Sequence, residues 1–169
     1  MSAVANSKTY GSADPTLATT NSGFLAADLG ALKITFSASR AAGESVALSP
    51  YTITPSASDG ATSLLGNYDV TYTPANFTIT TKTASVSAVL NTKVYGSTDP
   101  ALATTDSGFL AADLGAGKIT FSASRASGET VLGSPYLITP SASDGATSLL
   151  TNYDVTYTCL LYTSPSPRD

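Results

Sequence analysis

The side chains that could do chemistry in this chain are mainly carboxylates and tyrosines, because its 169 residues include no histidine. Without histidine, Ser–His and Cys–His pairs and the commonest metal ligand are excluded. Two carboxylates could still act as an acid and a base if both faced one cleft. The candidates in the first half of the chain are Asp14, Asp28, Glu44, Asp59 and Asp69.

These carboxylates are scattered over turns and the outside of one strand, which favours structural roles. Asp14 precedes a proline and Asp59 precedes a glycine, and both pairs are typical of turns. Asp28 falls in a short helical segment, where we expect a solvated face. Asp69 is expected on an exposed strand face. The sequence therefore predicts no catalytic residue and no enzyme.

Calcium is the metal to consider, because oxygen ligands are plentiful. A calcium loop gathers several carboxylates and carbonyls, whereas Asp59 stands alone in its loop and the chain has no D-x-D-x-D spacing. We expect no bound metal and no cofactor.

A covalent Lys–Asn cross-link beside an acidic residue, found in some bacterial proteins, is a further option. Such a bond needs a buried lysine, but Lys33 is expected to point outward from its strand, which disfavours the cross-link. The required residue types occur in both halves of the chain: Lys33, Asn67 and Glu44, then Lys118, Asn152 and Glu129.

Tyrosines could provide a different kind of site, because their rings can stack on a glycan. Three of the four tyrosines considered fall on the inward phase of their strands, so core packing is favoured over ligand contact. The four are Tyr10, Tyr51, Tyr68 and Tyr72.

The elements that must position these residues occur twice. Residues 8–73 align with residues 93–158 without a gap and with about a dozen substitutions, an offset of 93 − 8 = 85. Self-similarity at a fixed period indicates tandem domains. We expect one domain at 1–82, with its first strand truncated, and one at 83–158, without its closing strand.

Each copy is predicted to be mostly β, because small and apolar residues alternate with polar ones. A helix of one or two turns is expected at 22–30, with Phe24, Leu25 and Leu29 docked on a sheet. Prolines bracket residues 50–55, which suits an edge or short strand. Strands are expected at 17–20, 33–38, 50–55, 68–72, 76–80 and 83–90.

Composition excludes two classes of partner. Charged residues make up only 12% of the chain and the net charge is −4, whereas nucleic acids and anionic membranes attract basic patches. The chain also lacks an apolar run near the ~18 residues that a membrane-spanning helix needs.

The two ends depart from the repeat. Met1 aligns inside a strand of the second copy, which suggests an internal start. Residues 159–169 resemble the translation of a transposase adapter used in sequencing libraries, and we interpret them as a non-native tail. Without a closing strand, copy two should have an unpaired sheet edge beside its first strand. Cys159–Tyr162 is apolar enough to occupy the empty position.

The repeated motifs resemble the MBG/YDG family of tandem domains. The resemblance rests on Tyr10-Gly11, Asp14-Pro15 and Ala42-Gly43-Glu44, followed by Asn67 to Tyr72 and Phe77-Thr78-Ile79. It implies a mostly-β, β-grasp-like fold and no assigned catalytic residue. The residues themselves predict at most one short helix in each copy, and the brief segment Thr81-Lys82-Thr83 between the copies predicts that they stack as a stiff rod. The motif residues are Tyr10, Gly11, Asp14, Pro15, Gly43, Glu44, Tyr68 and Tyr72, with Tyr95, Gly96, Asp99, Pro100, Gly128, Glu129, Tyr153 and Tyr157 in the second copy.

The resemblance also implies a place and a role. Such domains occur in large bacterial adhesins and filamentous-haemagglutinin-like exoproteins, so we expect extracellular display. Near-identical copies suit a spacer that projects a distal adhesive region, with neighbouring repeats as its partners. The alternative is a module that binds a host glycan or protein weakly and gains by multivalency. Exposed aromatic side chains or a concave polar pocket would favour the alternative.

Overall fold

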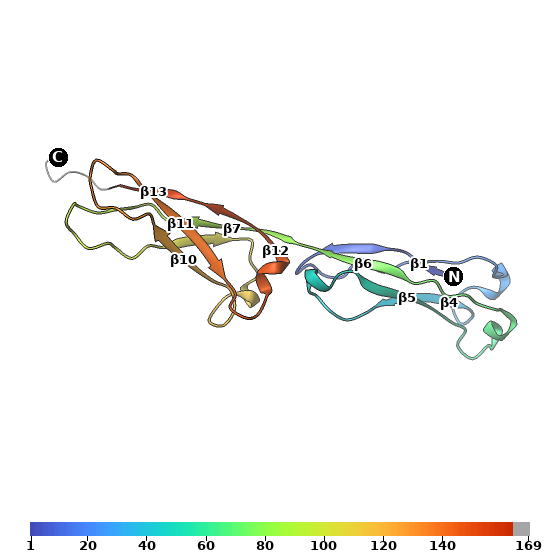
Figure 1. The fold of residues 1–169 in the computed structure, drawn as a ribbon. Helices are drawn as coiled ribbons and strands as arrows, with labels where there is room; N and C mark the ends of the chain where they lie inside the picture. The colour runs from blue at the N-terminus through green and yellow to red at the C-terminus, as the bar shows by residue number, and fades with distance from the viewer. Residues whose placement is uncertain (164–169) are drawn as a thin grey trace. The chain divides into compact units, whose positions relative to one another are not determined.

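The computed structural model describes residues 1–163 (Figure 1). The chain divides into two compact units, the first comprising Met1–Thr80 and the second beginning at Thr81. Strands, loops and single-turn 3-10 helices make up both units in the described residues. The mostly-β prediction is confirmed, and the β-grasp description stays a prediction.

The larger sheet of unit 1 places the N-terminal strand beside the C-terminal one. The pairing of β2 with β6 is parallel, and the other two pairings are antiparallel. Parallel pairing of the two ends closes the unit through contacts that are distant in sequence. The strands lie in the order β2 (Asn6–Thr9), β6 (Ala75–Thr80), β5 (Tyr51–Ser58) and β4 (Thr35–Arg40).

A second, small sheet of unit 1 pairs β1 (Ser2–Ala3) with β3 (Thr19–Thr20). Ser2 also bridges to Thr73 in parallel. Instead of one short helix, the loops of unit 1 contain three 3-10 turns: η1 (Ala26–Asp28), η2 (Val46–Leu48) and η3 (Leu64–Asn67).

Two sequence predictions for unit 1 need correction. The segment 22–30 contains only η1, and Leu25 is 66% exposed rather than docked on a sheet. The strand at 50–55 is not an edge strand, because β5 lies between β6 and β4. Pro55 is tolerated there because only Tyr51 to Ile53 pair with β6, so the pairing on that side ends before Pro55. On its other side Pro55 lies opposite Ala38 of β4.

In unit 2 the corresponding second sheet is longer. Its central strand β7 is parallel to β12 and antiparallel to β9. The strands lie in the order β12 (Tyr153–Thr158), β7 (Lys82–Ala88) and β9 (Thr104–Ser107). The 3-10 turns η4 (Ala111–Asp113) and η5 (Leu149–Asn152) match η1 and η3 of unit 1.

The larger sheet of unit 2 is completed by β13, which runs from Leu160 to Thr163. This strand lies between β11 and β8, as β6 lies between β5 and β2 in unit 1. The register is the same, because Tyr162 faces Tyr136 as Phe77 faces Tyr51. The order of the strands is β10 (Thr120–Arg125), β11 (Tyr136–Ser143), β13 and β8 (Asn91–Thr92).

The unpaired edge predicted for copy two is therefore wrong. Strand β7 has a neighbour on both sides, and the missing closing strand is replaced by residues 160–163. This is the position that the apolar residues at 159–162 were expected to fill. The interpretation of residues 159–169 as non-native stays a prediction, and its last six residues, 164–169, lie outside the described part of the chain.

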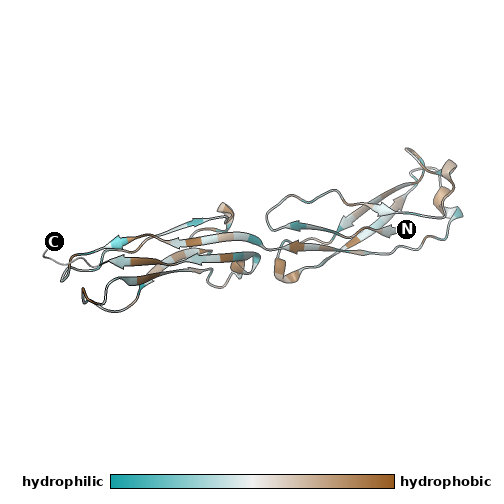
Figure 2. Ribbon diagram, turned by 90° about the horizontal axis from the view of Figure 1, so that it is seen from above, coloured by the Kyte–Doolittle hydropathy of each residue, from teal (hydrophilic) through white to brown (hydrophobic). Residues whose placement is uncertain are grey.

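The core of each unit is small and lies on the inner faces of the strands. Inward residues alternate with Ser and Thr, as in Tyr51, Ile53 and Pro55 of β5. The ribbon in Figure 2 is accordingly pale along most of its length, with short hydrophobic stretches. The fully buried side chains are Ile34, Ile53, Phe77 and Ile79 in unit 1, and Val86, Ile119, Ile138 and Tyr162 in unit 2.

Candidate functional site

Four charged side chains from separate segments of unit 1 meet beside the larger sheet, and we call this group the charge cluster. Lys8 comes from β2 and Arg40 from the end of β4, whereas Asp14 and Glu44 come from loops. The same contacts recur in unit 2. The cluster consists of Lys8, Asp14, Arg40 and Glu44 in unit 1 and of Lys93, Asp99, Arg125 and Glu129 in unit 2.

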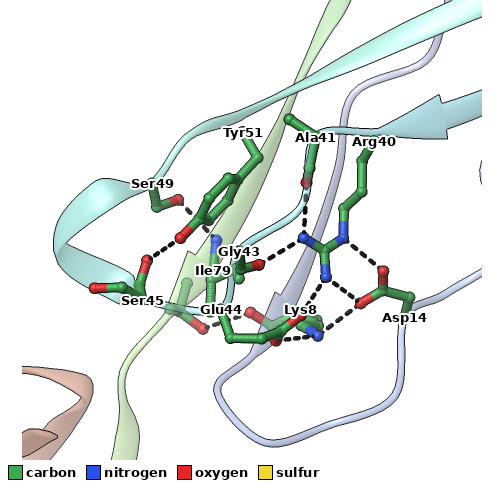
Figure 3. A network of polar contacts seen from close by, with 11 residues as sticks. Lys8, Asp14, Arg40, Ala41, Gly43, Glu44, Ser45, Ser49, Tyr51 and Ile79 are labelled. Carbon is green, nitrogen blue, oxygen red and sulfur yellow. Dashed lines mark hydrogen bonds and ion pairs between the residues drawn. The ribbon is translucent and has the colours of Figure 1, made fainter.

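The guanidinium of Arg40 uses all its hydrogen-bond donors. Nε and Nη2 donate to the two carboxylate oxygens of Asp14 at 2.5 and 3.0 Å, and Nη2 also donates to Glu44. Nη1 donates to the carbonyls of Ala41 and Gly43 at 3.1 and 2.7 Å (Figure 3). An arginine has five N–H groups in a rigid fork, so this side chain is fully satisfied although only 10% of it is exposed.

Two aromatic rings lie beneath this guanidinium. The Cζ atom of Arg40 is 4.9 Å from the centre of the Phe77 ring and 5.7 Å from that of Tyr51. Phe77 and Tyr51 are cross-strand partners, so the register of β5 and β6 sets the position of the charge. In unit 2, Tyr162 and Tyr136 occupy the same places below Arg125, at 5.3 and 5.5 Å.

Lys8 is the buried lysine of unit 1. Only 6% of its side chain is exposed, and Nζ lies 2.6 Å from Asp14 and 2.5 Å from Glu44. Burial by itself lowers the pKa of Lys8, but the hydrogen bonds to Asp14 and Glu44 outweigh burial and raise the pKa above its usual value. Lys8 therefore stays protonated and shares both carboxylates with Arg40.

The carboxylates are held ionised in turn. The hydrogen bonds from Arg40, and then from Lys8, lower the pKa of Asp14 to about 2. The hydrogen bond from Lys8, followed by that from Arg40, lowers the pKa of Glu44, against the opposing effect of burial. Joining a lysine to an aspartate as an amide needs a neutral amine and a protonated acid. The cluster favours the opposite ionisation states, so its geometry is that of an ion-pair network and not of a reacting pair.

Gly43 closes the loop over this network. Its φ of +135° lies in a region that residues with a side chain rarely adopt, and a Cβ placed there would be 2.3 Å from Cε1 of Tyr51. The Tyr51 hydroxyl donates to the carbonyl of Ser45 at 2.8 Å, which fixes the ring against the loop. Gly128 repeats this arrangement in unit 2.

A second polar contact orders the turn η1. The hydroxyl of Tyr68 donates to Asp28 at 2.6 Å and accepts from the backbone N–H of Leu25 at 3.1 Å. The hydrogen bond to Asp28 raises the pKa of Tyr68, because the carboxylate favours the neutral phenol. The Tyr68 ring also packs 4.9 Å from Phe24. Asp28 thus has a specific partner and is not the simply solvated residue that the sequence predicts.

The remaining candidate residues have local roles. Asp59 accepts from the backbone N–H of Leu65 at 2.7 Å and so supports the turn η3. Asp69 is exposed. Lys33 is exposed, as expected, and donates to the carbonyl of Ala27, whereas Glu44 belongs to the charge cluster. The lysine and the acid that were considered for a cross-link therefore have different partners. Among residues 1–163, no three His, Cys, Asp or Glu side chains gather as a metal site.

Comparison with known families decides what the repeat is. Residues 1–78 and 84–159 each match the model of the MBG domain, YGX type. This chain belongs to the MBG family. The YGX of that description fits Tyr10-Gly11-Ser12 in the first domain and its counterpart beginning at Tyr95 in the second. No curated protein and no solved structure gave a match.

The residues on which the sequence resemblance rests either belong to the charge cluster or shape the loops beside it. Asp14 and Glu44, with Asp99 and Glu129, supply the acids of the charge cluster, and Gly43 gives it room. The prolines after the two aspartates, Pro15 and Pro100, continue the loops that carry these acids. Gly11 and Gly96 adopt φ of +77° and +83° in tight turns.

The tyrosines of the MBG motif differ in exposure. Tyr10 is 8% exposed and its N–H donates to the carbonyl of Thr80, whereas Tyr95 is 54% exposed. Tyr153 is buried, and its counterpart Tyr68 is half-buried. Tyr72 is 44% exposed, and so is Tyr157. Core packing therefore explains only some of the tyrosines considered from the sequence.

The sequence did not point to the two basic members of the charge cluster in unit 1, Lys8 and Arg40. The available signal was that both recur in the second copy of a chain with few charges. Two acids and two bases repeated together would have suggested ion pairing.

MBG domains occur as repeats in extracellular surface proteins and are a non-catalytic type of domain. In the described part of this chain, no helix has the length and apolar character needed to cross a membrane.

Proposed function

We propose that the two MBG domains are spacer repeats of a large bacterial cell-surface or secreted adhesin, which project a distal adhesive region and catalyse no reaction. The supporting observation is the repeated charge cluster. In both copies the same four charged side chains are paired with one another and hold loops against the sheet. The charged residues of the cluster thus stabilise each domain, as a spacer requires.

The junction between the domains also supports this role. Strand β6 ends at Thr80 and β7 begins at Lys82, so a single residue separates an element of one domain from an element of the next. A linker of one residue has little freedom compared with Gly- or Ser-rich tethers. Such a junction suits a stiff array whose partners are neighbouring repeats, displayed outside the cell.

The test is the dimension of longer arrays. Chains of two, four and six copies, joined through Thr81, are measured by small-angle X-ray scattering. For a spacer, the largest dimension grows in proportion to copy number. A control array with a flexible Gly-Ser linker at each junction should grow more slowly, roughly as the square root of length. Equal growth of the two series would refute the stiff spacer.

A second candidate function is weak binding of a host glycan or protein by each domain. The observation in its favour is that Tyr72 and Tyr157 occupy equivalent positions and are both 44% exposed. An array could bind through such rings by multivalency although each contact is weak. Binding to immobilised glycans and host matrix proteins by a six-copy array, lost in the array with both tyrosines changed to Ser, would favour this role over the spacer alone.

A further inference from the structure

The larger sheet of each unit ends on one side in a strand that has a single neighbour. In unit 1 this strand is β4, and in unit 2 it is β10. Each pairs only with the next strand, β5 or β11, in an unbroken register. Among residues 1–163, no further strand lies beyond β4 or β10. We call the outer sides of these two strands the free edges.

The register shows which backbone groups face the free edge of β4. The N–H of Ala41 donates to the carbonyl of Thr52 at 2.9 Å, so the backbone groups of Ala41 face β5. Successive residues of a strand direct these groups to opposite sides, so those of Phe36, Ala38 and Arg40 face outward. None of these outward N–H and C=O groups bonds to another segment of residues 1–163.

The protein itself adds a short segment to this edge, one step before the open positions. The N–H of Ile34 donates to the carbonyl of Asp28 at 3.0 Å, and the carbonyl of Ile34 accepts from Gly30 at 3.2 Å. Leu29 thereby forms a parallel bridge with Ile34. The chain then turns back, because the N–H of Lys33 donates to the carbonyl of Gly30 at 3.0 Å. The edge thus accepts extended backbone, and its own cover stops at Ile34.

Unit 2 has the same free edge. Residues 35–40 and 120–125 both read Thr-Phe-Ser-Ala-Ser-Arg. The short cover is repeated, since Ile119 donates to Asp113 at 2.9 Å and accepts from Gly115 at 3.1 Å. In this unit the second sheet contains the seven-residue strand β7, and the edge of β10 is still open. The free edge is therefore a property of the repeat.

The free edges lack the features that usually stop strands of different molecules from pairing. Natural edge strands are short, bulged, or interrupted by proline or charged residues. The other outer strands follow this rule: β2 contains Lys8, β9 contains Asp106 and β12 contains Asp154, while β1, β3 and β8 have two residues each. Strands β4 and β10 have six residues and no proline, and their one charge, the final arginine, is paired within its own unit.

The edge is complementary to a second copy of itself in the antiparallel direction. With Ala38 opposite its own counterpart, Ser37 lies opposite the partner's Ser39. Serine hydroxyls already bond across this sheet in both units, with Oγ atoms 2.7 and 2.8 Å apart. The same alignment places Arg40 opposite the partner's Phe36. A parallel alignment would instead set the two arginines side by side, and like charges in that position are destabilising.

We propose that the free edges of β4 and β10 are docking sites for a second copy of this chain, which pairs in the antiparallel direction through the same strands. The partner's strand continues the sheet, and main-chain hydrogen bonds at the outward residues hold the copies together. One edge pair is a small and weak interface, but every repeat contributes an edge, so an array gains by multivalency. This interface goes beyond the spacer function, because it joins arrays side by side.

The test follows four forms of the full ¹⁵N-labelled chain by NMR and sedimentation as the protein concentration rises. For the original chain we expect a dissociation constant on the order of 1 mM, with amide shifts concentrated at the free edges. Two edge variants carry either Lys or Asp at the same four exposed serines, Ser37, Ser39, Ser122 and Ser124. A control variant carries Lys one strand further in on the same exposed face, and it loses the same Ser–Ser hydrogen bonds: Thr54→Lys, Ser56→Lys, Thr139→Lys and Ser141→Lys.

Each edge variant alone should associate at least ~10-fold more weakly than the original chain, because like charges then face each other across the pair. An equimolar mixture of the two edge variants should associate again, since the lysines of one chain face the aspartates of the other. The control variant should associate as the original chain does. In the six-copy array the association should be at least ~10-fold tighter, which brings a weak pair into the measurable range.

Two results would overturn the proposal. One is the absence of self-association in both the original chain and its six-copy array. The other is self-association of the edge variants that equals that of the original chain. Neither result bears on the spacer function, because the growth of array length is measured separately by scattering.

Discussion

A single hydroxyl distinguishes the two ring positions beneath the clustered arginines. Phe77 is fully buried in unit 1, and Tyr162 takes its place in unit 2 with no exposed surface. The hydroxyl oxygen of Tyr162 is buried without a hydrogen-bond partner among the described residues. Burial raises the pKa of this phenol, as expected where the charged form is poorly solvated.

Tyr162→Phe should therefore stabilise unit 2. An unsatisfied buried polar group costs about 1–3 kcal/mol, so we expect a gain of roughly 1–2 kcal/mol. The matched control is Phe77→Tyr, which should destabilise unit 1 by a similar amount. Hydrogen exchange of core amides in β11 and β5 reads each unit separately. A loss of protection in unit 2 on removal of the hydroxyl would mean that this group has a partner.

Gly43 offers a test of packing at fixed backbone conformation. Gly43 and Gly30 have φ of +135° and +132°, but an added Cβ meets the Tyr51 ring at the first and open space at the second. Both Ala variants carry backbone strain of about 1–3 kcal/mol. Gly43→Ala should be less stable than Gly30→Ala by a further ~1–3 kcal/mol, because the ring must move. Chemical denaturation of the two variants provides the measurement. Equal losses would show that the Tyr51 ring yields freely.

At the residue scale, sequence identified the acids but not what they contact. Asp14 and Glu44 are visible as turn residues, and the glycine before Glu44 is visible as part of the same turn. Their partner Arg40 lies on β4 and Lys8 on β2, at opposite edges of the sheet. Only the strand order brings these side chains together above the Phe77 ring, and local patterns do not encode strand order.

At the element scale, alternation located β4, β5 and β6 but not their neighbours. The prolines around β5 suggested an edge, yet the pairing with β6 stops at Ile53, so no carbonyl of β6 needs the N–H that Pro55 lacks. The strand predicted at 68–72 is absent, whereas the identical sequence at 153–157 is a strand. Identical residues with and without a partner show that strand formation depends on a neighbour as much as on propensity.

The strand that closes the larger sheet of unit 2, β13, can be tested by replacing its sequence with that of β6. Strand β13 pairs with β11 and β8 through Leu160–Thr163, in the register that Ala75–Thr78 has in unit 1. Replacing residues 159–165 by the sequence of the equivalent residues 74–80 should stabilise unit 2 by ~2 kcal/mol or more. The gain comes from removal of the unpaired hydroxyl and from an isoleucine that copies Ile79, which is 2% exposed.

The effect of this replacement is measured as the urea midpoint of unit 2, and a fluorescent or NMR probe on β11 monitors its unfolding. A chain that stops at Thr158 is the opposite control, because it removes the ring below Arg125, leaves β11 with β10 as its one neighbour in the sheet and leaves β8 without its partner. Unit 2 should then lose its protected amides while unit 1 keeps them. Retention of protection in the shortened chain would show that the larger sheet closes without β13.

At the scale of the whole molecule, each domain has an equivalent pair of ion-paired carboxylates, so both domains should lose stability over the same range of acid pH. Hydrogen bonds from the arginines, and then from the lysines, lower the pKa of Asp14 and Asp99 to about 2 from 3.8. The pKa values of Glu44 and Glu129 are lowered from 4.5, first by the hydrogen bonds from the lysines. In the unfolded chain these acids regain their ordinary values and bind protons more readily.

A folded-state pKa below the unfolded one gives stability that is fully present above the unfolded pKa and is lost as pH falls toward the folded value. Urea midpoints should therefore be steady from pH 7 to about 5 and should fall between pH ~4.5 and 2, in both units. The Asp14→Asn, Asp99→Asn double variant keeps an oxygen acceptor at each site but cannot titrate. It should be less stable at pH 7, and its midpoints should fall less steeply in acid. If the urea midpoints of the variant and of the original chain fall equally steeply between pH ~4.5 and 2, other carboxylates cause the acid sensitivity and the charge clusters do not.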